Sequence, residues 1–233
     1  MAGKFITFEG PDGSGKTSVL KEIAARLTQK GTVEYLLTRE PGGNRIAEKI
    51  RGIILDKQLG EMDARTEALL YAAARRQHLV ETVLPALKAD KLVLCDRYVD
   101  SSIVYQGAGR GLGEAAVAHM NEFATNGLLP ELTLYFDVSP EIGLKRIARF
   151  RSNEVNRLDK ESLTFHETVH AAYLRMAKAE KRIVTIDASQ PFKNVVSAAL
   201  QQLNKRCQVC LINFVKNGGK QDENDHCNCA GQR

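Results

Sequence analysis

The chain has 233 residues, of which 43% are hydrophobic and 26% charged, with a formal net charge of +5. These values are ordinary for a soluble globular protein, and the length allows one large α/β domain. No run approaches the roughly 20 apolar residues that cross a bilayer, and the first residues lead into a strand rather than a signal peptide. We therefore expect a cytoplasmic protein without a membrane partner. The mild positive charge suits small anionic ligands, and no nucleic-acid partner is expected.

A glycine-rich stretch follows the first predicted strand, residues 4–8, and opens a helical pattern. It reads Glu9-Gly10-Pro11-Asp12-Gly13-Ser14-Gly15-Lys16-Thr17. A strand, a glycine loop and a helix N-terminus in this order are typical of a phosphate-binding P-loop. The glycines let successive backbone N–H groups face an anion. We expect residues 10–17 to bind ATP, with Lys16 on the outer phosphates and Thr17 on a magnesium ion.

Strand-like and helix-like patterns alternate along the rest of the chain. Further strands are predicted at 33–38, 92–95, 132–136 and 182–187. Helices are predicted after the P-loop and at 46–54, 65–87, 114–126, from 140 onward, 161–181 and 192–203, with a loop at 107–113. This alternation predicts a doubly wound, parallel five-stranded sheet flanked by helices.

Two strand ends carry residues that suit phosphate chemistry. Asp96 closes the apolar strand 92–95, the position of an acid that lies near the magnesium ion in P-loop proteins, and Arg97 beside it has a planar fork that can clamp a phosphate. The strand 33–38 leads into Arg39-Glu40-Pro41-Gly42-Gly43, in which the proline fixes its backbone and the glycines permit a sharp reversal. Cys95, inside an apolar strand, is expected to be a buried, inert thiol.

An arginine-rich stretch follows the helix that begins near residue 140. It contains Arg146, Arg149, Arg151 and Arg157 with few acidic residues. One interpretation is a mobile lid, at about 146–158, that brings positive charge onto a transferring phosphoryl group. The alternative is a plain surface helix with basic residues.

The final residues, 207–233, break the alternating pattern, so we assign residues 1–206 to a single P-loop domain and the remainder to a tail. The segment 218–225 is polar and predicts disorder. Cys207, Cys210, His226, Cys227 and Cys229 have the side chains that bind zinc, but the second cysteine pair is spaced Cys-x-Cys. The tail is thus either unstructured or a non-native extension, or it holds a zinc ion.

Four motifs in order resemble those of the thymidylate kinases, and in particular the bacterial enzymes. They are the P-loop run from Phe8, Thr38-Arg39-Glu40-Pro41-Gly42-Gly43, Asp96-Arg97-Tyr98-Val99-Asp100-Ser101-Ser102 and Tyr105-Gln106-Gly107. The resemblance extends over about residues 1–205. It implies the fold of P-loop nucleoside monophosphate kinases, transfer of the γ-phosphate of ATP to thymidine monophosphate (dTMP) with Mg²⁺, and a homodimer.

The resemblance also implies contacts with the phosphate and sugar of dTMP. Asp12 would accept a hydrogen bond from the 3′-hydroxyl. Arg97, together with Arg39 or Arg51, would approach the acceptor phosphate. Glu40 and Pro41 would shape that wall of the site, and Tyr105 would crowd the 2′ position and favour a deoxyribose.

The base would be held by a second group of residues. Tyr71 lies at the position where the family stacks an aromatic ring on thymine, and Arg75, Ser102 and Gln106 would read its polar edge. Because the P-loop here contains no arginine, the family pattern implies that the catalytic arginine comes from the lid, with Arg149, Arg151 and Arg157 as candidates.

Two other functions compete with this interpretation. A GTPase-like switch would need a guanine-reading Asn-Lys-x-Asp, and Asn204-Lys205-Arg206-Cys207 lacks the acidic residue. Among enzymes, the nearest alternative is another P-loop nucleotide or deoxynucleoside kinase.

Overall fold

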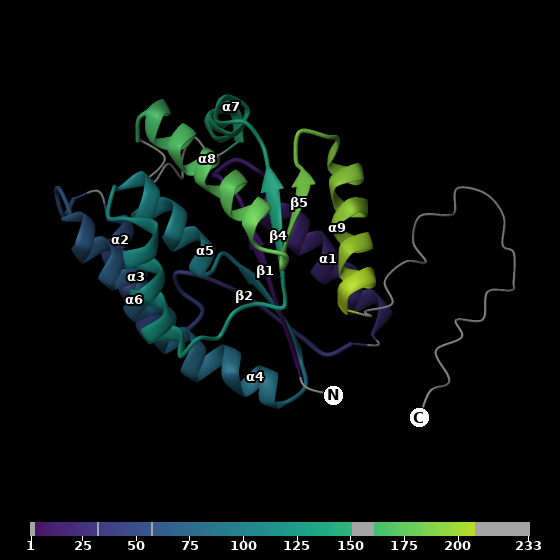
Figure 1. The fold of residues 1–233 in the computed structure, drawn as a ribbon. Coiled ribbons are helices and arrows are strands. Elements are labelled where there is room, and N and C mark those ends of the chain that lie inside the picture. The colour runs from purple at the N-terminus through teal and green to yellow at the C-terminus, as the bar shows by residue number, and fades with distance from the viewer. Residues whose placement is uncertain (1–2, 32, 57, 151–160, 208–233) are drawn as a thin grey trace, which may run out of the picture.

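The computed structural model describes residues 3–31, 33–56, 58–150 and 161–207. Within these residues, five strands form one sheet in the spatial order β2-β3-β1-β4-β5. The strands are β1 (Lys4–Glu9), β2 (Tyr35–Arg39), β3 (Leu92–Asp96), β4 (Leu132–Asp137) and β5 (Ile183–Asp187). Every pairing between neighbours is parallel. The predicted parallel five-stranded sheet is confirmed (Figure 1).

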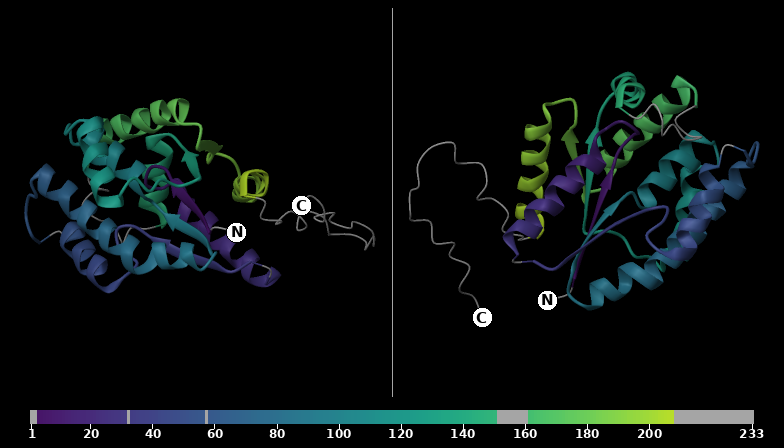
Figure 2. Two further views of the ribbon diagram at one scale, coloured as in Figure 1. Left: turned by 60° about the horizontal axis from the view of Figure 1, so that its bottom comes forward. Right: turned by 180° about the vertical axis from the view of Figure 1, so that it is seen from behind.

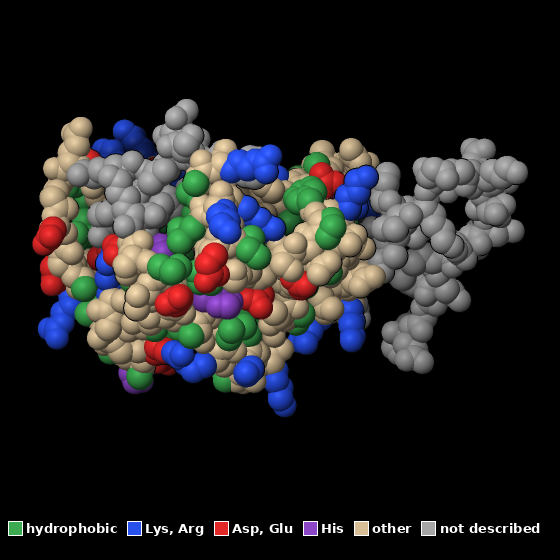
Figure 3. All heavy atoms as spheres, turned by 90° about the horizontal axis from the view of Figure 1, so that it is seen from above, with side chains coloured by type: hydrophobic (Ala, Val, Ile, Leu, Met, Phe, Trp, Pro, Cys, Tyr) green, Lys and Arg blue, Asp and Glu red, His purple; other side chains and the backbone are tan. Residues whose placement is uncertain are grey.

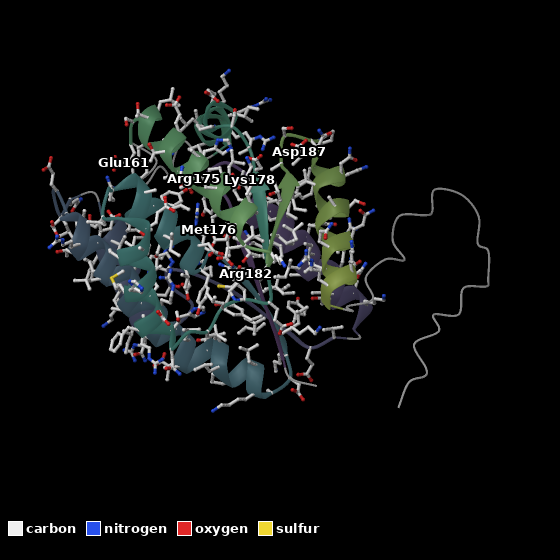
Figure 4. The ribbon with its side chains drawn as sticks, viewed as in Figure 1. Glu161, Arg175, Met176, Lys178, Arg182 and Asp187 are labelled. Atoms are coloured by element: carbon white, nitrogen blue, oxygen red, sulfur yellow. The ribbon has the colours of Figure 1, made fainter. Side chains whose placement is uncertain are left out.

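The central strands are apolar runs because helices cover both of their faces. β3 is buried along its whole length, and β4 is buried except at Asp137. The edge strands β2 and β5 each have exposed positions. The strand direction can be followed in Figure 4, where Arg182, just before β5, lies below Asp187 at the end of β5. The carboxyl edge of the sheet is therefore at the top of Figures 1 and 4.

Helices α1 (Lys16–Lys30) and α9 (Phe192–Cys207) cover one face of the sheet (Figures 1 and 2). Their apolar stripes pack against even-numbered strand residues such as Ile6, Leu94 and Leu134. Successive side chains of a strand point to opposite faces, so these positions share one side. α1 ends at Gly31, whose φ of 63° makes it a left-handed C-cap.

The odd-numbered residues of β1, β3, β4 and β5 pack against helices on the opposite face. Within the described residues, seven helical elements lie between β2 and β4 in the sequence. They are α2 (Arg45–Leu55), α3 (Ala64–His78), the π-helix η1 (Leu79–Val83), α4 (Leu84–Lys88), α5 (Val99–Ser102), the π-helix η2 (Ile103–Gly109) and α6 (Glu114–Thr125). After β4 come α7 (Pro140–Phe150) and α8 (Leu163–Ala179). η1 and α4 cover β1 and β3, whereas α8 and η2 cover β4 and β5.

Two π-turns distinguish the structure from the sequence-based elements. The helix predicted at 65–87 is α3, η1 and α4 in unbroken succession. Its wide turn directly precedes Pro85, which has no N–H and whose ring disfavours a regular turn. The loop predicted at 107–113 begins only after η2, because α5 continues into this π-helix through Gly107 and Gly109. The predicted start of this loop at residue 107 is therefore wrong, because η2 extends to Gly109.

Two predicted regions lie wholly or partly outside the described residues. The lid includes 151–160, and nearly all of the tail and its candidate zinc ligands lie beyond 207. Among the described helices, none is long and apolar enough to cross a membrane.

Candidate active site

The predicted P-loop connects β1 to α1 at the carboxyl edge of the sheet. Gly10 and Gly13 have φ of 148° and 77°, and a Cβ atom on Gly13 would lie 2.1 Å from the carbonyl oxygen of Gly143. Only glycine fits there, because the backbone of α7 closes directly over the loop. A Cβ on Gly15 would instead meet nothing within 4 Å, so this turn of the loop is open.

Lys16 brings a positive charge into this loop. It is only 6% exposed, and burial together with the nearby Arg97 lowers the pKa of its ammonium group. An anion at the loop would offset the cost of burying that charge. Beside it, Thr17 Oγ1 donates a hydrogen bond to Asp96 Oδ2 from the end of β3. The two predicted metal ligands are thus adjacent although they lie far apart in the sequence.

A cleft of about 390 Å³ opens next to the P-loop. Seen from above, this edge of the molecule has Lys and Arg side chains gathered toward its middle, beside Asp and Glu (Figure 3). All the residues predicted to bind the acceptor line the cleft: Asp12, Arg39, Glu40, Pro41, Arg51, Tyr71, Arg75, Arg97, Ser102, Tyr105 and Gln106. The lining also includes Lys16, Thr17 and Asp96. Ser18, Leu55, Tyr98 and Ser101 complete it and were not predicted.

The loop after β2 forms one wall of the cleft. Its Glu40–Pro41 peptide bond is cis, and the Pro41 carbonyl accepts hydrogen bonds from Arg39 Nη1 at 2.8 Å and Arg51 Nη1 at 3.0 Å. Two guanidinium groups therefore converge on one carbonyl oxygen. Burial and the neighbouring Arg39 lower the pKa of Arg51. This concentration of positive charge suits a phosphate group.

Arg97 links the turn after β3 to the P-loop. Its Nη2 donates to Asp12 Oδ1 at 2.8 Å, and its guanidinium carbon lies 5.1 Å from the centre of the Tyr105 ring. The Tyr105 hydroxyl donates to the other Asp12 oxygen at 2.9 Å. Burial raises the pKa of Tyr105, so its hydroxyl keeps its proton and acts as a donor. Asp12 thus has a fixed orientation before any ligand binds.

Comparison with known proteins agrees with this geometry. The thymidylate kinase family profile matches residues 8–199. The chain is 63% identical over 202 residues to the thymidylate kinase of Latilactobacillus sakei, a match that spans 86% of this chain and 94% of that one. The chain belongs to the thymidylate kinase family.

Two further thymidylate kinases extend the comparison. That of Lactiplantibacillus plantarum is 56% identical over 224 residues, which are 96% of this chain and 100% of the relative. This match is longer than the 206 residues assigned to the kinase domain, so it includes part of 207–233. The crystal structure of thymidylate kinase from Ehrlichia chaffeensis has a TM-score of 0.70 at 29% identity, covering 87% of this chain and 99% of that chain. The family and the fold expected from the motifs are confirmed.

A buried ionic network behind the cleft was only partly anticipated for this thymidylate kinase family member. Glu40 Oε2 accepts from Arg75 Nε at 2.7 Å, and Glu40 Oε1 lies 2.9 Å from His78 Nδ1. Arg75 also donates to Ser102, Asn121 and the Tyr98 carbonyl. The described residues therefore take four of its five N–H groups, and one N–H of Nη2 remains for a ligand. His78 and Asn121 had no sequence signal beyond being polar residues within predicted helices.

Glu9 is a second buried group, and no role was predicted for it although it begins the glycine-rich stretch. Its carboxylate accepts hydrogen bonds from the Tyr98 N–H at 2.7 Å, the Ser101 hydroxyl at 2.5 Å and the Tyr173 hydroxyl at 2.8 Å. Ser101 in turn accepts from Arg97 Nη1 at 2.9 Å. Glu9 therefore fixes the turn that carries Arg97.

The free energy of unfolding is expected to depend on the protonation of Glu9. Burial raises the pKa of this carboxyl from 4.5 to about 7. The folded state then binds the proton more tightly than the unfolded state, so this group's contribution to stability should fall as the pH rises from 4.5 to 7. Urea unfolding measured across this pH range should show the free energy of unfolding of the wild type falling as the pH rises. Glu9→Gln should lack this fall. A Glu22→Gln variant, changed on the surface of α1, should retain the pH dependence of the wild type.

The predicted catalytic arginines are described only in part. Arg149 lies on the exposed side of α7, whereas Arg151 and Arg157 fall outside the described residues. Arg146, at the start of the predicted lid, donates to the Ala188 carbonyl at 3.1 Å. It therefore ties α7 to the end of β5.

Proposed function

We propose that this protein phosphorylates dTMP to dTDP with the γ-phosphate of ATP, the reaction expected for the thymidylate kinase family. One observation supports this most directly: a single cleft joins the P-loop residues Lys16 and Thr17 to a wall of arginines and to a polar end that includes Gln106. A donor triphosphate on the P-loop would thus meet an acceptor phosphate within the same space.

The reaction is a direct transfer. An oxygen of the dTMP phosphate attacks the γ-phosphorus of ATP, the bond from that phosphorus to the β–γ bridging oxygen breaks, and ADP leaves. No protein nucleophile is required. The chain's contribution is to align the two phosphates and to neutralise charge, with Lys16 on the donor side and Arg39, Arg51 and Arg97 on the acceptor side. Arg149, Arg151 or Arg157 would add the catalytic arginine.

Thr17 and Asp96 would hold the magnesium ion. A hydroxyl and a carboxylate are hard oxygen ligands, and magnesium in kinase sites typically combines one or two carboxylates with substrate phosphates and water. The described residues contain no cluster of three or more His, Cys, Asp or Glu side chains suited to a metal. This donor set therefore fits an ion that arrives with the nucleotide. The bound ion would neutralise charge on the transferring phosphate.

The acceptor would lie along the remainder of the cleft. Asp12 would accept from the 3′-hydroxyl and Tyr105 would exclude a 2′-hydroxyl. Tyr71 would stack on the base, while Arg75, Ser102 and Gln106 would contact its polar edge. Glu40 and Pro41 would shape the wall beside the phosphate.

A second copy of this chain is the proposed protein partner. α3 and α6 present an apolar surface that includes Leu69, 59% exposed, and Phe123, 90% exposed. A hollow of about 890 Å³ lies between these side chains and is lined also by Met120 and Leu128. Pairing of this surface with its copy would remove the large apolar residues from water.

Acceptor selectivity tests the proposal. With ATP and Mg²⁺ fixed, kcat/KM is expected to be highest for dTMP. It should be roughly 10–200-fold lower for dUMP, which lacks one methyl group. It should be lower still for dCMP, whose N3 and amino group invert the hydrogen-bonding pattern of thymine.

Two variants connect this selectivity to the cleft. Gln106→Leu should reduce kcat/KM for dTMP, and Tyr105→Ala should narrow the gap between dUMP and UMP. If dCMP matched dTMP in the wild type, the proposed acceptor would be wrong, and another nucleotide kinase activity would replace it.

A further inference from the structure

Gln106, at the base end of the cleft, is held by a buried carboxylate on another helix. Gln106 lies on η2 and is 2% exposed, and its Nε2 donates to Glu67 Oε1 at 2.9 Å. Glu67 lies in the first turn of α3 and is fully buried. A buried carboxylate beside a ligand-facing amide can determine whether the NH₂ group or the oxygen of that amide faces the ligand.

The charge of Glu67 is balanced by Arg110. Arg110 Nη2 lies 3.3 Å from Glu67 Oε2, and its Nε donates to Oε1 at 3.4 Å. The same guanidinium lies 2.7 Å from Glu161 and 5.0 Å from the centre of the Phe165 ring. Figure 4 labels Glu161 at the upper left of the molecule, near the start of α8. The positive charge of Arg110 at this distance favours the carboxylate form of Glu67, which burial alone would disfavour.

An ionised carboxylate accepts hydrogen bonds and donates none. The amide of Gln106 must therefore turn its NH₂ group toward Glu67, which leaves its oxygen on the opposite side. Among the described residues, none donates a hydrogen bond to the amide oxygen of Gln106, Oε1. The Gln106 side chain also lines the cleft. Glu67 thus makes the base-facing end of Gln106 a hydrogen-bond acceptor.

Pyrimidine bases differ in this respect. Thymine and uracil carry a hydrogen on N3, which an acceptor binds, whereas the N3 of cytosine is itself an acceptor. We propose that Glu67 is a specificity-determining positioning residue, which fixes the amide orientation of Gln106 and thereby selects an N3–H base over cytosine. The inference rests on the proposed function, because it places the base of the acceptor beside Gln106.

The central experiment replaces Glu67 with glutamine, which has the same shape but no charge. Its amide can either accept from or donate to Gln106, so the Gln106 amide becomes free to rotate. We expect kcat/KM for dTMP to fall roughly tenfold and the ratio of dCMP to dTMP kcat/KM to rise by about tenfold or more. The change should appear mainly in KM for the acceptor, with KM for ATP unchanged.

Two comparisons separate this role from a general structural one. Glu114→Gln also removes a carboxylate paired with an arginine, Arg175, but outside the cleft, and should leave the ratio unchanged. In a Gln106→Leu background, Glu67→Gln should no longer alter the ratio, because the group through which it acts is absent. An equal change in both backgrounds would overturn the inference.

If Glu67→Gln does not fold, Arg110→Met provides a second test. Without its cation, the buried Glu67 should take up a proton more readily and become able to donate, so the dCMP to dTMP ratio should rise as the pH is lowered. A ratio unchanged from wild type across pH would contradict the inference. If the wild type prefers dTMP and Glu67→Gln keeps the same selectivity, the positioning role of Glu67 is refuted and the proposed function stands. A wild type without preference for dTMP would refute the proposed function instead.

Discussion

Replacing Lys16 with alanine is expected to lower kcat by two to three orders of magnitude. The Lys16 side chain lies buried in the P-loop, where its charge would act on the outer phosphates of ATP with little screening by solvent. Electrostatic groups in such surroundings typically contribute several kcal/mol to stabilisation of the transition state. A steady-state assay of ADP release at saturating dTMP would measure the loss.

The same variant should not be less stable than the wild type. Burial and Arg97 lower the pKa of Lys16, which means that its charge opposes folding when no anion is present. The melting temperature of Lys16→Ala without nucleotide should therefore equal or exceed that of the wild type. Lys21→Ala, changed on the exposed side of α1, should retain full activity. Activity of Lys16→Ala within about tenfold of the wild type would show that the lysine has no catalytic role.

The phosphate end of the cleft was predictable because its residues follow the strand ends, whereas the residues at its base end were expected only from the family resemblance. Parallel strands end at one edge of the sheet, so residues placed directly after them converge there whatever their separation in the chain. Thr17 and Asp96 lie 79 positions apart and are in contact. The positions of the P-loop, of the Arg39–Gly43 loop and of Arg97 at this edge follow for the same reason.

The buried polar networks were not predictable in this way. Glu9 and Tyr173 are 164 positions apart, and Glu67 and Gln106 are 39 apart on two helices. Glu9, Glu67 and Tyr173 are unremarkable in their own segments, and the pairing of Gln106 with Glu67 depends on packing between helices. The π-helix η2 adds to the difficulty, because it presents Tyr105 and Gln106 from a region partly read as a loop. Periodicity identifies the buried face of a helix, but it does not identify the hydrogen-bond partners of the polar groups on that face.

Arg97 offers the clearest separation of catalytic from structural effects. It is a non-glycine residue with φ of 69°, a left-handed conformation that costs about 1–2 kcal/mol for a residue with a Cβ atom. Surrounding contacts hold it there: its N–H donates to the Phe8 carbonyl at 3.0 Å, and Glu9 fixes the next residue, Tyr98. The backbone and the guanidinium of Arg97 can therefore be tested independently.

Arg97→Ala and Arg97→Gly should lose activity equally but differ in stability. Both lack the guanidinium that would stabilise the phosphates, so kcat should fall at least about 100-fold in each. Glycine adopts the left-handed conformation without strain, so Arg97→Gly should be more stable than Arg97→Ala by up to about 1 kcal/mol. Arg97→Lys keeps the charge but not the planar fork, and its kcat should still be at least about tenfold below the wild type.

Steady-state kinetics and urea unfolding of the three variants would measure these effects. Arg175→Ala, which removes an exposed arginine paired with Glu114, serves as the control and should match the wild type in kcat. If Arg97→Gly kept nearly full activity, Arg97 would act through its backbone alone. If its kcat fell while its stability was maintained, the loss would belong to the side chain, because the turn that carries it would still be folded.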